Sequence, residues 1–316
     1  MRPFLSLMSP EGSSARLSIL IFHRVVAQVD PLFPDEVHAA RFDALCGWLA
    51  RDFNVLPLSP AVRRLREGSL PRRALSITFD DGYADNHDIA LPILQRHGLH
   101  ATFFVATGFL NGGRMWNDTV VEAVRSSPLS SLDLGSLGLQ GVTRLSIASL
   151  AEKQSAIRQL LSAVKYLDPA HRLAVVNELA RVSIAELPDD LMMTSAQVVG
   201  LHAAGMTIGG HTVNHPILAV LSDADARREI AVGRDTLQDT IQAPVTAFAY
   251  PNGRPSEDYS PRTVELVREL GFELAVATSW GAARVNADHY QLPRFTPWDR
   301  SRGRFNLRIA ANLLRR

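Results

Sequence analysis

Residues 74–83 read ALSITFDDGY, an apolar run that ends on two adjacent carboxylates and a glycine. The run is short and rich in β-branched and aromatic residues, so it predicts a buried strand that ends at Asp80 and Asp81. Gly82 permits a turn there, because glycine adopts positive φ at little cost. Such a turn can direct both carboxylates into one cleft, so Asp80 and Asp81 can take different roles.

Two histidines follow a second predicted strand. Residues 206–215 read MTIGGHTVNH, which places His211 and His215 four positions apart after a glycine break, where they can face the same way. Two imidazoles and one carboxylate are the ligand set of catalytic zinc sites that keep a fourth position for water. We therefore assign Asp81 and the two histidines to a divalent metal. Asp80 is then available as the general base that takes a proton from the metal-activated water.

Each motif also has a simpler interpretation. An isolated Asp-Asp-Gly sequence is usually only a turn, and an isolated pair of histidines four apart is more often solvated or buried in a core. Their joint placement after two apolar strands favours one shared site. Two histidines and one carboxylate also form the facial triad of iron oxygenases, but the adjacent Asp80 and the alternating strands and helices argue against that class.

At these residues the chain resembles the polysaccharide deacetylase family, the NodB-homology carbohydrate esterases. Residues 78–82 (TFDDG) match its first motif, and residues 211–215 (HTVNH) match its second. The resemblance implies a distorted (β/α) barrel in which the first Asp is the base and the second Asp and both His hold the metal. The expected ion is Zn²⁺, with Co²⁺, Ni²⁺ or Mn²⁺ as alternatives, and the implied reaction is N-deacetylation of an amino sugar.

The third motif of the family is present in altered form. Family members often have Arg-Pro-Pro-Tyr-Gly, whereas residues 249–253 of this chain read AYPNG. The backbone amide of Asn252 can still donate to an oxyanion. Ala249 stands where the family has the Arg that pairs with the base, and Arg294 is our candidate to supply that charge from another strand.

The late Leu-x-His motif that supplies a general acid in the family is not evident near the C-terminus. The sequence SILIFHRV at 18–25 is instead a predicted strand ending in histidine, which resembles the exopolysaccharide and poly-N-acetylglucosamine deacetylase branch. His23 is the candidate acid, because small shifts place an imidazole pKa near neutrality. A strand-end histidine bonded to nearby backbone is the alternative. The expected substrate contacts are Tyr83, Tyr250, Pro251 and Trp280, with core packing as an alternative for Trp280.

The composition is that of an ordinary soluble globular protein, with 46% hydrophobic and 21% charged residues. Its 33 basic and 32 acidic residues give a net charge of +1 and no reason to expect a nucleic-acid partner. The single cysteine, Cys46, excludes an intrachain disulfide and fits a reducing compartment. The N-terminal segment has no long apolar run, so we expect a cytoplasmic enzyme, with a periplasmic or membrane-associated location as the alternative.

Strands and helices alternate through most of the chain, which predicts an α/β architecture. We expect one barrel domain over residues 15–300, with a helical insertion at about 111–193 that forms either a lid or a structural appendage. Residues 301–316 form a basic tail. It is either a solvated face or an amphipathic helix that touches anionic membrane through Ile309, Ala310, Leu313 and Leu314.

The predicted function is metal-dependent removal of N-acetyl groups from an amino-sugar polysaccharide, oligosaccharide or glycoconjugate, as in exopolysaccharide biosynthesis. Two alternatives stay open. One is a hydrolase of the same fold that acts on a non-carbohydrate amide or imide. The other is a catalytically inactive carbohydrate-binding homologue. This alternative is suggested by the missing Arg of the third motif and the missing His of the late motif.

Overall fold

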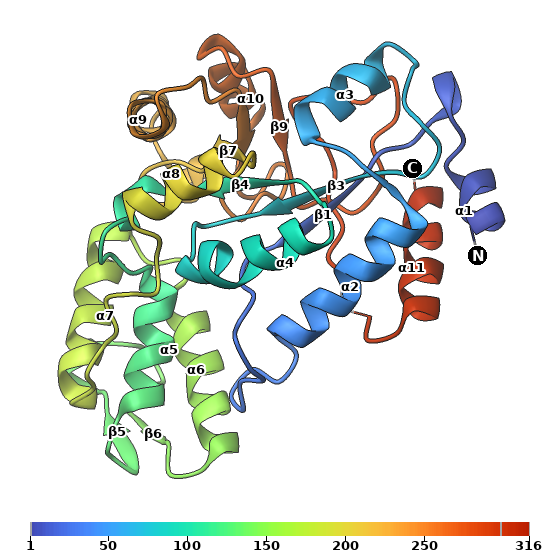
Figure 1. Ribbon diagram of the computed structural model, residues 1–316. Helices are drawn as coiled ribbons and strands as arrows, with labels where there is room; N and C mark the ends of the chain where they lie inside the picture. Colours follow the sequence, from blue (N-terminus) through green and yellow to red (C-terminus); the bar gives the residue numbers. More distant parts are fainter. Residues whose placement is uncertain (1, 298, 316) are drawn as a thin grey trace. The chain divides into compact units, whose positions relative to one another are not determined.

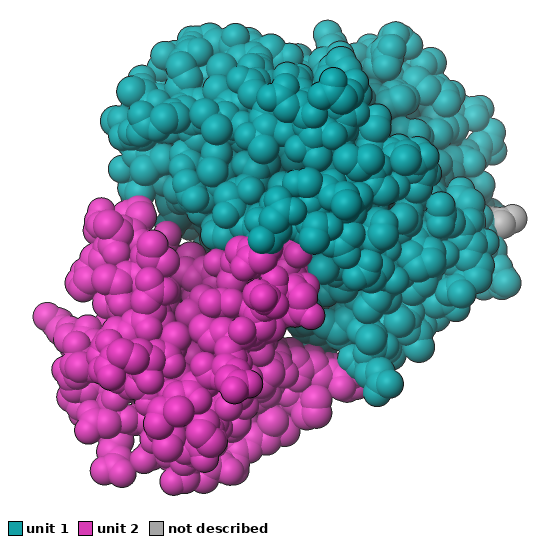
Figure 2. All heavy atoms as spheres, turned by 60° about the vertical axis from the view of Figure 1, so that its left-hand side comes forward, with its two compact units in different colours: residues 1–28, 35–111, 193–316 teal, residues 29–34, 112–192 magenta. Residues whose placement is uncertain are grey.

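The computed structural model describes residues 2–297 and 299–315 (Figure 1). The chain forms two compact units, coloured teal and magenta in Figure 2. Unit 1 comprises residues 1–28, 35–111 and 193–316, and unit 2 comprises residues 29–34 and 112–192. Unit 2 thus contains the segment predicted as an insertion together with a short stretch, 29–34, from the predicted barrel.

Unit 1 is built on a parallel sheet whose strands follow one another in the order β1-β3-β4-β7-β8-β9, with β2 also paired to β3. Every residue of the first three strands in this order is buried, as expected of parallel strands covered on both faces. The strands are β1 (Ser18–Phe22), β2 (Asn54–Val55), β3 (Ala74–Phe79), β4 (Ala101–Val105), β7 (Thr207–Gly210), β8 (Ala247–Ala249) and β9 (Leu274–Val276).

The two ends of this sheet are joined by residues 292–295. Leu292 forms a parallel bridge with Val276 of β9, and Phe295 forms a parallel bridge with Leu20 of β1. The sheet therefore curls into a half-barrel whose edge strands share one extended segment. Helices surround it, and the predicted α/β fold of the distorted-barrel type is confirmed.

Side chains alternate between the two faces of the sheet, as strand geometry requires. Phe103 packs on the face covered by helices, whereas Phe104 belongs to a second apolar cluster on the opposite, interior face. Leu58, Val62 and Leu65 of α3 complete the interior cluster. The helices of unit 1 are α1 (Arg2–Met8), α2 (Ala39–Asp52), α3 (Leu58–Arg66), α4 (Leu91–Arg96), α8 (Ser195–Ala203), α9 (Asp223–Ile241), α10 (Pro261–Glu269) and α11 (Arg302–Leu314).

The predicted basic tail is helix α11, which lies beside α1 in Figure 1. Ile309, Ala310 and Leu313 of this helix are buried in the main core, so the expectation that they touch a membrane is wrong. Their apolar stripe covers the protein instead, and only Leu314 of the predicted set is exposed. No helix in the described part of the chain combines the length and apolar composition that a membrane crossing requires.

Unit 2 contains three α-helices and a short antiparallel pair of strands, with an apolar core of their own. An ion pair of 2.7 Å between Asp30 and Arg125 attaches the 29–34 stretch to α5. The lid function of this segment stays a prediction. Its elements are α5 (Trp116–Ser126), β5 (Ser131–Asp133), β6 (Arg144–Ser146), α6 (Leu150–Val164) and α7 (Pro169–Ser183).

Candidate active site and metal centre

Asp81, His211 and His215 lie together at the carboxyl ends of β3 and β7. The Nε2 atoms of both histidines are 3.4 Å from Oδ1 of Asp81, and the three candidate ligand atoms all lie within 4.8 Å of one another. Asp81 and His215 have positive φ values of 77° and 50°, so tight turns direct these side chains back across the sheet edge. The structure thus brings the predicted ligand set together.

The protonation and bonding of these residues fit a divalent cation. Oδ1 of Asp81 is buried and accepts no hydrogen bond from any described residue, which is costly for a carboxylate unless a cation binds it. Nδ1 of His211 lies 2.7 Å from the carbonyl oxygen of Ala249, so it donates there and leaves Nε2 as the ligand atom. Ligating histidines usually make such a second bond.

The pKa values of the two histidines shift in opposite directions. Burial lowers the pKa of His215 to about 4, so its imidazole is neutral near pH 7, as metal binding requires. Burial also lowers the pKa of His211, but Asp81 and Asp80 outweigh it and the net pKa is raised. Although burial raises the pKa of Asp81, the two histidines bring it well below its usual range.

Asp80, the neighbour of Asp81, has a different environment. Its two carboxylate oxygens each accept a 2.6 Å hydrogen bond from the guanidinium of Arg294. Arg294 is itself almost fully buried and is held by the hydroxyl of Thr78 at 3.2 Å and the carbonyl of Ala277 at 2.9 Å. Burial raises the pKa of Asp80, but the charge of Arg294 lowers it to a net value below the ordinary range, so the carboxylate is ionised.

The turn that carries both histidines is fastened by α9. Glu229 accepts hydrogen bonds from the backbone amides of Val213 and Asn214 at 3.0 and 2.8 Å. Gly233, one turn later, lies so close to Thr212 that an added Cβ would meet its backbone at 2.8 Å. The sequence analysis missed Glu229, because nothing in its local sequence marks it as the acceptor for a turn more than a dozen residues earlier.

The altered third motif forms a tight turn after β8. Asn252 has a φ of 57°, and its carbonyl accepts a 2.8 Å hydrogen bond from the hydroxyl of Thr278. Its backbone amide donates to no residue in the part of the chain that the structure describes. That amide is therefore available to a ligand, as the sequence predicts. Pro251 is buried within the same turn.

Two aromatic residues expected to contact substrate lie inside the protein. Tyr250 is fully buried, its hydroxyl donates to the carbonyl of Tyr290 at 3.0 Å, and its ring stacks on Tyr259. Tyr83 is 3% exposed and its ring lies under the guanidinium of Arg24. A contact of either ring with substrate stays an untested prediction. These side chains pack the turns that follow β8 and β3 and support the site from within.

Trp280, which the sequence places against the active-site pocket, is half-buried. Its ring packs edge-on against Phe295, with the ring centroids 5.5 Å apart, and the guanidinium of Arg315 lies 4.9 Å from its centroid. These contacts correspond to the core-packing alternative. They leave a contact with substrate as an untested prediction.

His23 follows β1 and is exposed at the same edge of the sheet. Asp85 and Asn86, which follow the first motif in sequence, hold the backbone around His23 in place. Asn86 donates to the carbonyl of His23 at 2.9 Å, and Asp85 accepts from the amide of Val25 at 3.1 Å. Burial raises the pKa of Asp80, and the charge of Arg294 lowers it. His23 is among the groups that lower the pKa of Asp80 further. A hollow of about 210 Å³ adjoins His23.

Comparison with known proteins agrees with this geometry. Residues 67–130 and 183–275 match the family model for polysaccharide deacetylase, a region that contains all three motifs but neither His23 nor Arg294. The Bacillus subtilis (strain 168) protein named "Putative polysaccharide deacetylase YxkH" is 22% identical over 282 residues, which are 89% of this chain and 71% of that protein.

Two solved structures share the fold. The Streptococcus pyogenes deacetylase PplD in complex with acetate has a TM-score of 0.59 at 20% identity, over 90% of this chain and 92% of that one. IcaB from Ammonifex degensii also has a TM-score of 0.59, at 18% identity, over 96% of this chain and 99% of that one. With its motifs, fold and ligand cluster in agreement, this chain belongs to the polysaccharide deacetylase family.

Proposed function

We propose that this chain is a metal-dependent N-deacetylase that hydrolyses the acetamide of an acetylated amino sugar in a polysaccharide, oligosaccharide or glycoconjugate. The observation that carries the proposal is the unequal bonding of two adjacent buried carboxylates. Asp80 is fully paired with Arg294, whereas Oδ1 of Asp81 faces two imidazoles and has no hydrogen bond among the described residues. This is the division between base and ligand that such chemistry needs.

Asp81, His211 and His215 would hold the metal, and Zn²⁺ suits their two nitrogens and one oxygen. When bound there, a divalent metal lowers the pKa of water and polarises a carbonyl oxygen. Asp80 accepts the proton of the attacking water, and its pairing with Arg294 keeps it ionised and oriented.

Two further groups act on the acetamide itself. The amide of Asn252 donates to the oxygen that gains negative charge as water attacks the acetyl carbon. His23 protonates the sugar nitrogen as the C–N bond breaks, so the products are acetate and a free amine. The deacetylase PplD has been solved with bound acetate, which would be the product of this reaction. The exposed position of His23 beside a hollow agrees with a role at the leaving group.

The test is acetate release from acetylated chitooligosaccharides by the full chain with added Zn²⁺. We expect activity in the wild-type protein and its loss in Asp80→Asn, with metal content measured by mass spectrometry nearly unchanged. Retained activity in the variant would refute the role of Asp80. A wild-type protein that binds Zn²⁺ but releases no acetate from sugars, and that hydrolyses a cyclic imide instead, would favour the alternative amide or imide hydrolase.

A further inference from the structure

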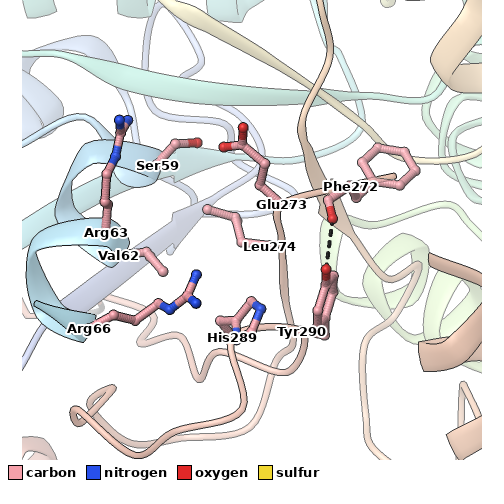
Figure 3. Close-up of a pocket in the computed structure, with 9 residues that line it drawn as sticks. All are labelled: Ser59, Val62, Arg63, Arg66, Phe272, Glu273, Leu274, His289 and Tyr290. Atoms are coloured by element: carbon pink, nitrogen blue, oxygen red, sulfur yellow. Dashed lines mark hydrogen bonds between the residues drawn. The ribbon is translucent and has the colours of Figure 1, made fainter. Parts of the chain in front are cut away.

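A hollow of about 540 Å³ opens in unit 1 (Figure 3). Its lining includes residues 272–274 at the start of β9, so it lies at the end of the strands opposite to the metal ligands, which follow β3 and β7. It lies between α3 and the residues that lead into β9, with His289 and Tyr290 along one side. Its base is apolar, formed by side chains that include Val62 and Leu274. The hydroxyl of Tyr290 donates to the carbonyl of Phe272 at 2.9 Å and fixes that wall.

One end of the hollow is basic. Figure 3 shows the guanidinium of Arg66 and the ring of His289 pointing toward one another, whereas the guanidinium of Arg63 lies further along α3, beside Ser59. None of these three side chains has an ion pair or hydrogen bond within residues 2–297 and 299–315. Elsewhere on the same unit, Arg262 pairs with Asp223 at 2.9 Å. Arg66, His289 and Arg63 thus differ from Arg262 in having no carboxylate partner among the described residues.

The pKa of His289 lies below its ordinary value. Burial lowers it first, and the charges of Arg66 and Arg268 lower it further, whereas Asp288 only partly compensates. Arg268 lies over the ring of Tyr290, with its guanidinium carbon 4.8 Å from the ring centroid. An anion placed between Arg66 and His289 would relieve this repulsion.

The other end of the hollow carries one basic and one acidic side chain. The guanidinium of Arg63, the hydroxyl of Ser59 and the carboxylate of Glu273 line it, and none of these side chains has a partner within the described ranges. A carboxylate accepts hydrogen bonds from hydroxyl groups, and it repels a second negative charge. Because Arg63 and Glu273 carry opposite charges, this end has no net positive charge, so the lining favours one anionic group at the end formed by Arg66 and His289.

We propose that this hollow binds a small polyol phosphate, with the phosphate between Arg66 and His289 and the hydroxyl groups against Ser59 and Glu273. A guanidinium can donate two parallel hydrogen bonds to two oxygens of one phosphate. Such charge-assisted hydrogen bonds are stronger than those between neutral groups. The apolar base of Val62 and Leu274 offers a surface for the carbon skeleton of the ligand. The site uses no residue assigned to deacetylation, so the test of this site and the test of the proposed function are independent.

Calorimetric titration of the full chain with glucose 6-phosphate, inorganic phosphate and glucose tests this proposal. We expect glucose 6-phosphate to bind, inorganic phosphate to bind more weakly and glucose to give no measurable heat. Arg66→Gln should weaken glucose 6-phosphate binding by at least about tenfold, since it removes a charged hydrogen-bond donor. The matched control is Arg304→Gln, an exposed arginine of α11 with no side-chain partner in the described chain, and it should leave binding unchanged.

Proton NMR supplies an independent measurement, with the His289 signal assigned by its absence in His289→Gln. The pKa of His289 should rise when glucose 6-phosphate binds, because the phosphate neutralises the charge of Arg66. Equal affinity in Arg66→Gln and the wild type would overturn the proposal. So would binding that is lost in His211→Ala instead, because the phosphate would then lie on the metal ligands.

Discussion

Asp80 and Arg294 lie 214 residues apart in the chain and form a buried two-point ion pair with both nitrogen–oxygen distances at 2.6 Å. Arg294 belongs to the segment 292–295 that bridges β9 and β1, so its side chain reaches Asp80 from the interior of the half-barrel. The family motif places an arginine where this chain has Ala249. Here the same charge comes from a different strand, and Asp81 is left to face the histidines.

Replacement of Arg294 by Gln should shift the pH dependence of the reaction. Burial raises the pKa of Asp80 and Arg294 lowers it, so the variant retains mainly the effect of burial and its base is protonated at higher pH. The base must be ionised to accept a proton. We therefore expect the acidic limb of kcat/KM for acetate release to move upward by at least about one pH unit, the shift typical of a lost charge partner.

The same variant should also lose stability, because a buried carboxylate without its partner costs about 3–5 kcal/mol in the free energy of unfolding. Urea unfolding measures this loss. Arg294→Lys is the matched control. It keeps the positive charge but loses the two parallel hydrogen bonds to Asp80, so its pH profile should lie between those of the wild type and Arg294→Gln. An unchanged profile in Arg294→Gln would show that the pair does not set the pKa of the base.

Metal binding should depend on the three ligand residues and not on Asp80. Removal of Zn²⁺ by a chelator should lower the melting temperature of the wild type, because a ligand at 100 times its Kd adds about 2.7 kcal/mol to the native state. His211→Ala should bind no stoichiometric Zn²⁺ and should show no chelator effect. Asp80→Asn should behave like the wild type, and equimolar Zn²⁺ in His211→Ala would contradict the assigned ligand set.

The ligand cluster could be predicted from sequence because each member directly follows an apolar strand. Parallel strands end at the same edge of a sheet, so Asp81 after β3 and the histidines after β7 meet there although β4 lies between their strands. The pairing of Asp80 with Arg294 needed the resemblance to a family as a guide. No local pattern shows that residues 292–295 lie between β9 and β1.

The sequence predicted which residues lie near the site better than it predicted which way their side chains point. Tyr250 and Tyr83 lie within or next to the motifs in sequence, but both side chains are buried. The amphipathic pattern of α11 was also visible. Periodicity shows that a helix has an apolar face, but it does not show whether protein or membrane covers that face.

Glu229 should act as a positioning residue for the metal site. Its carboxylate holds the amides of Val213 and Asn214, between the two ligand histidines. Removal of such outer partners typically lowers metal affinity by about 10–100-fold. We expect Glu229→Ala to weaken Zn²⁺ binding within that range, measured by competition with a fluorescent chelator, while the pH profile of the Zn²⁺-saturated enzyme stays near that of the wild type.

Glu229→Gln separates positioning from a general loss of stability. It keeps one side-chain oxygen that accepts from the backbone, so it should recover part of the affinity lost in Glu229→Ala. Asp235→Asn, on the same helix, removes an exposed carboxylate whose partner is Arg234 and should have no effect. Equal Zn²⁺ affinity in Glu229→Ala and the wild type would show that the histidine turn holds its shape without this contact.

His23 should matter only where the leaving group needs a proton. An amine leaves poorly as its anion, whereas 4-nitrophenolate leaves readily without protonation. We therefore expect His23→Gln to lower kcat for an acetylated chitooligosaccharide by about 10²–10⁴-fold, the usual contribution of a general acid, and to leave hydrolysis of 4-nitrophenyl acetate and Zn²⁺ content nearly unchanged. If His23 only fixes the end of β1 through its backbone contact with Asn86, the two activities should change by the same factor. The ratio of the two rates therefore separates an acid from a structural histidine, even in a variant that folds less well.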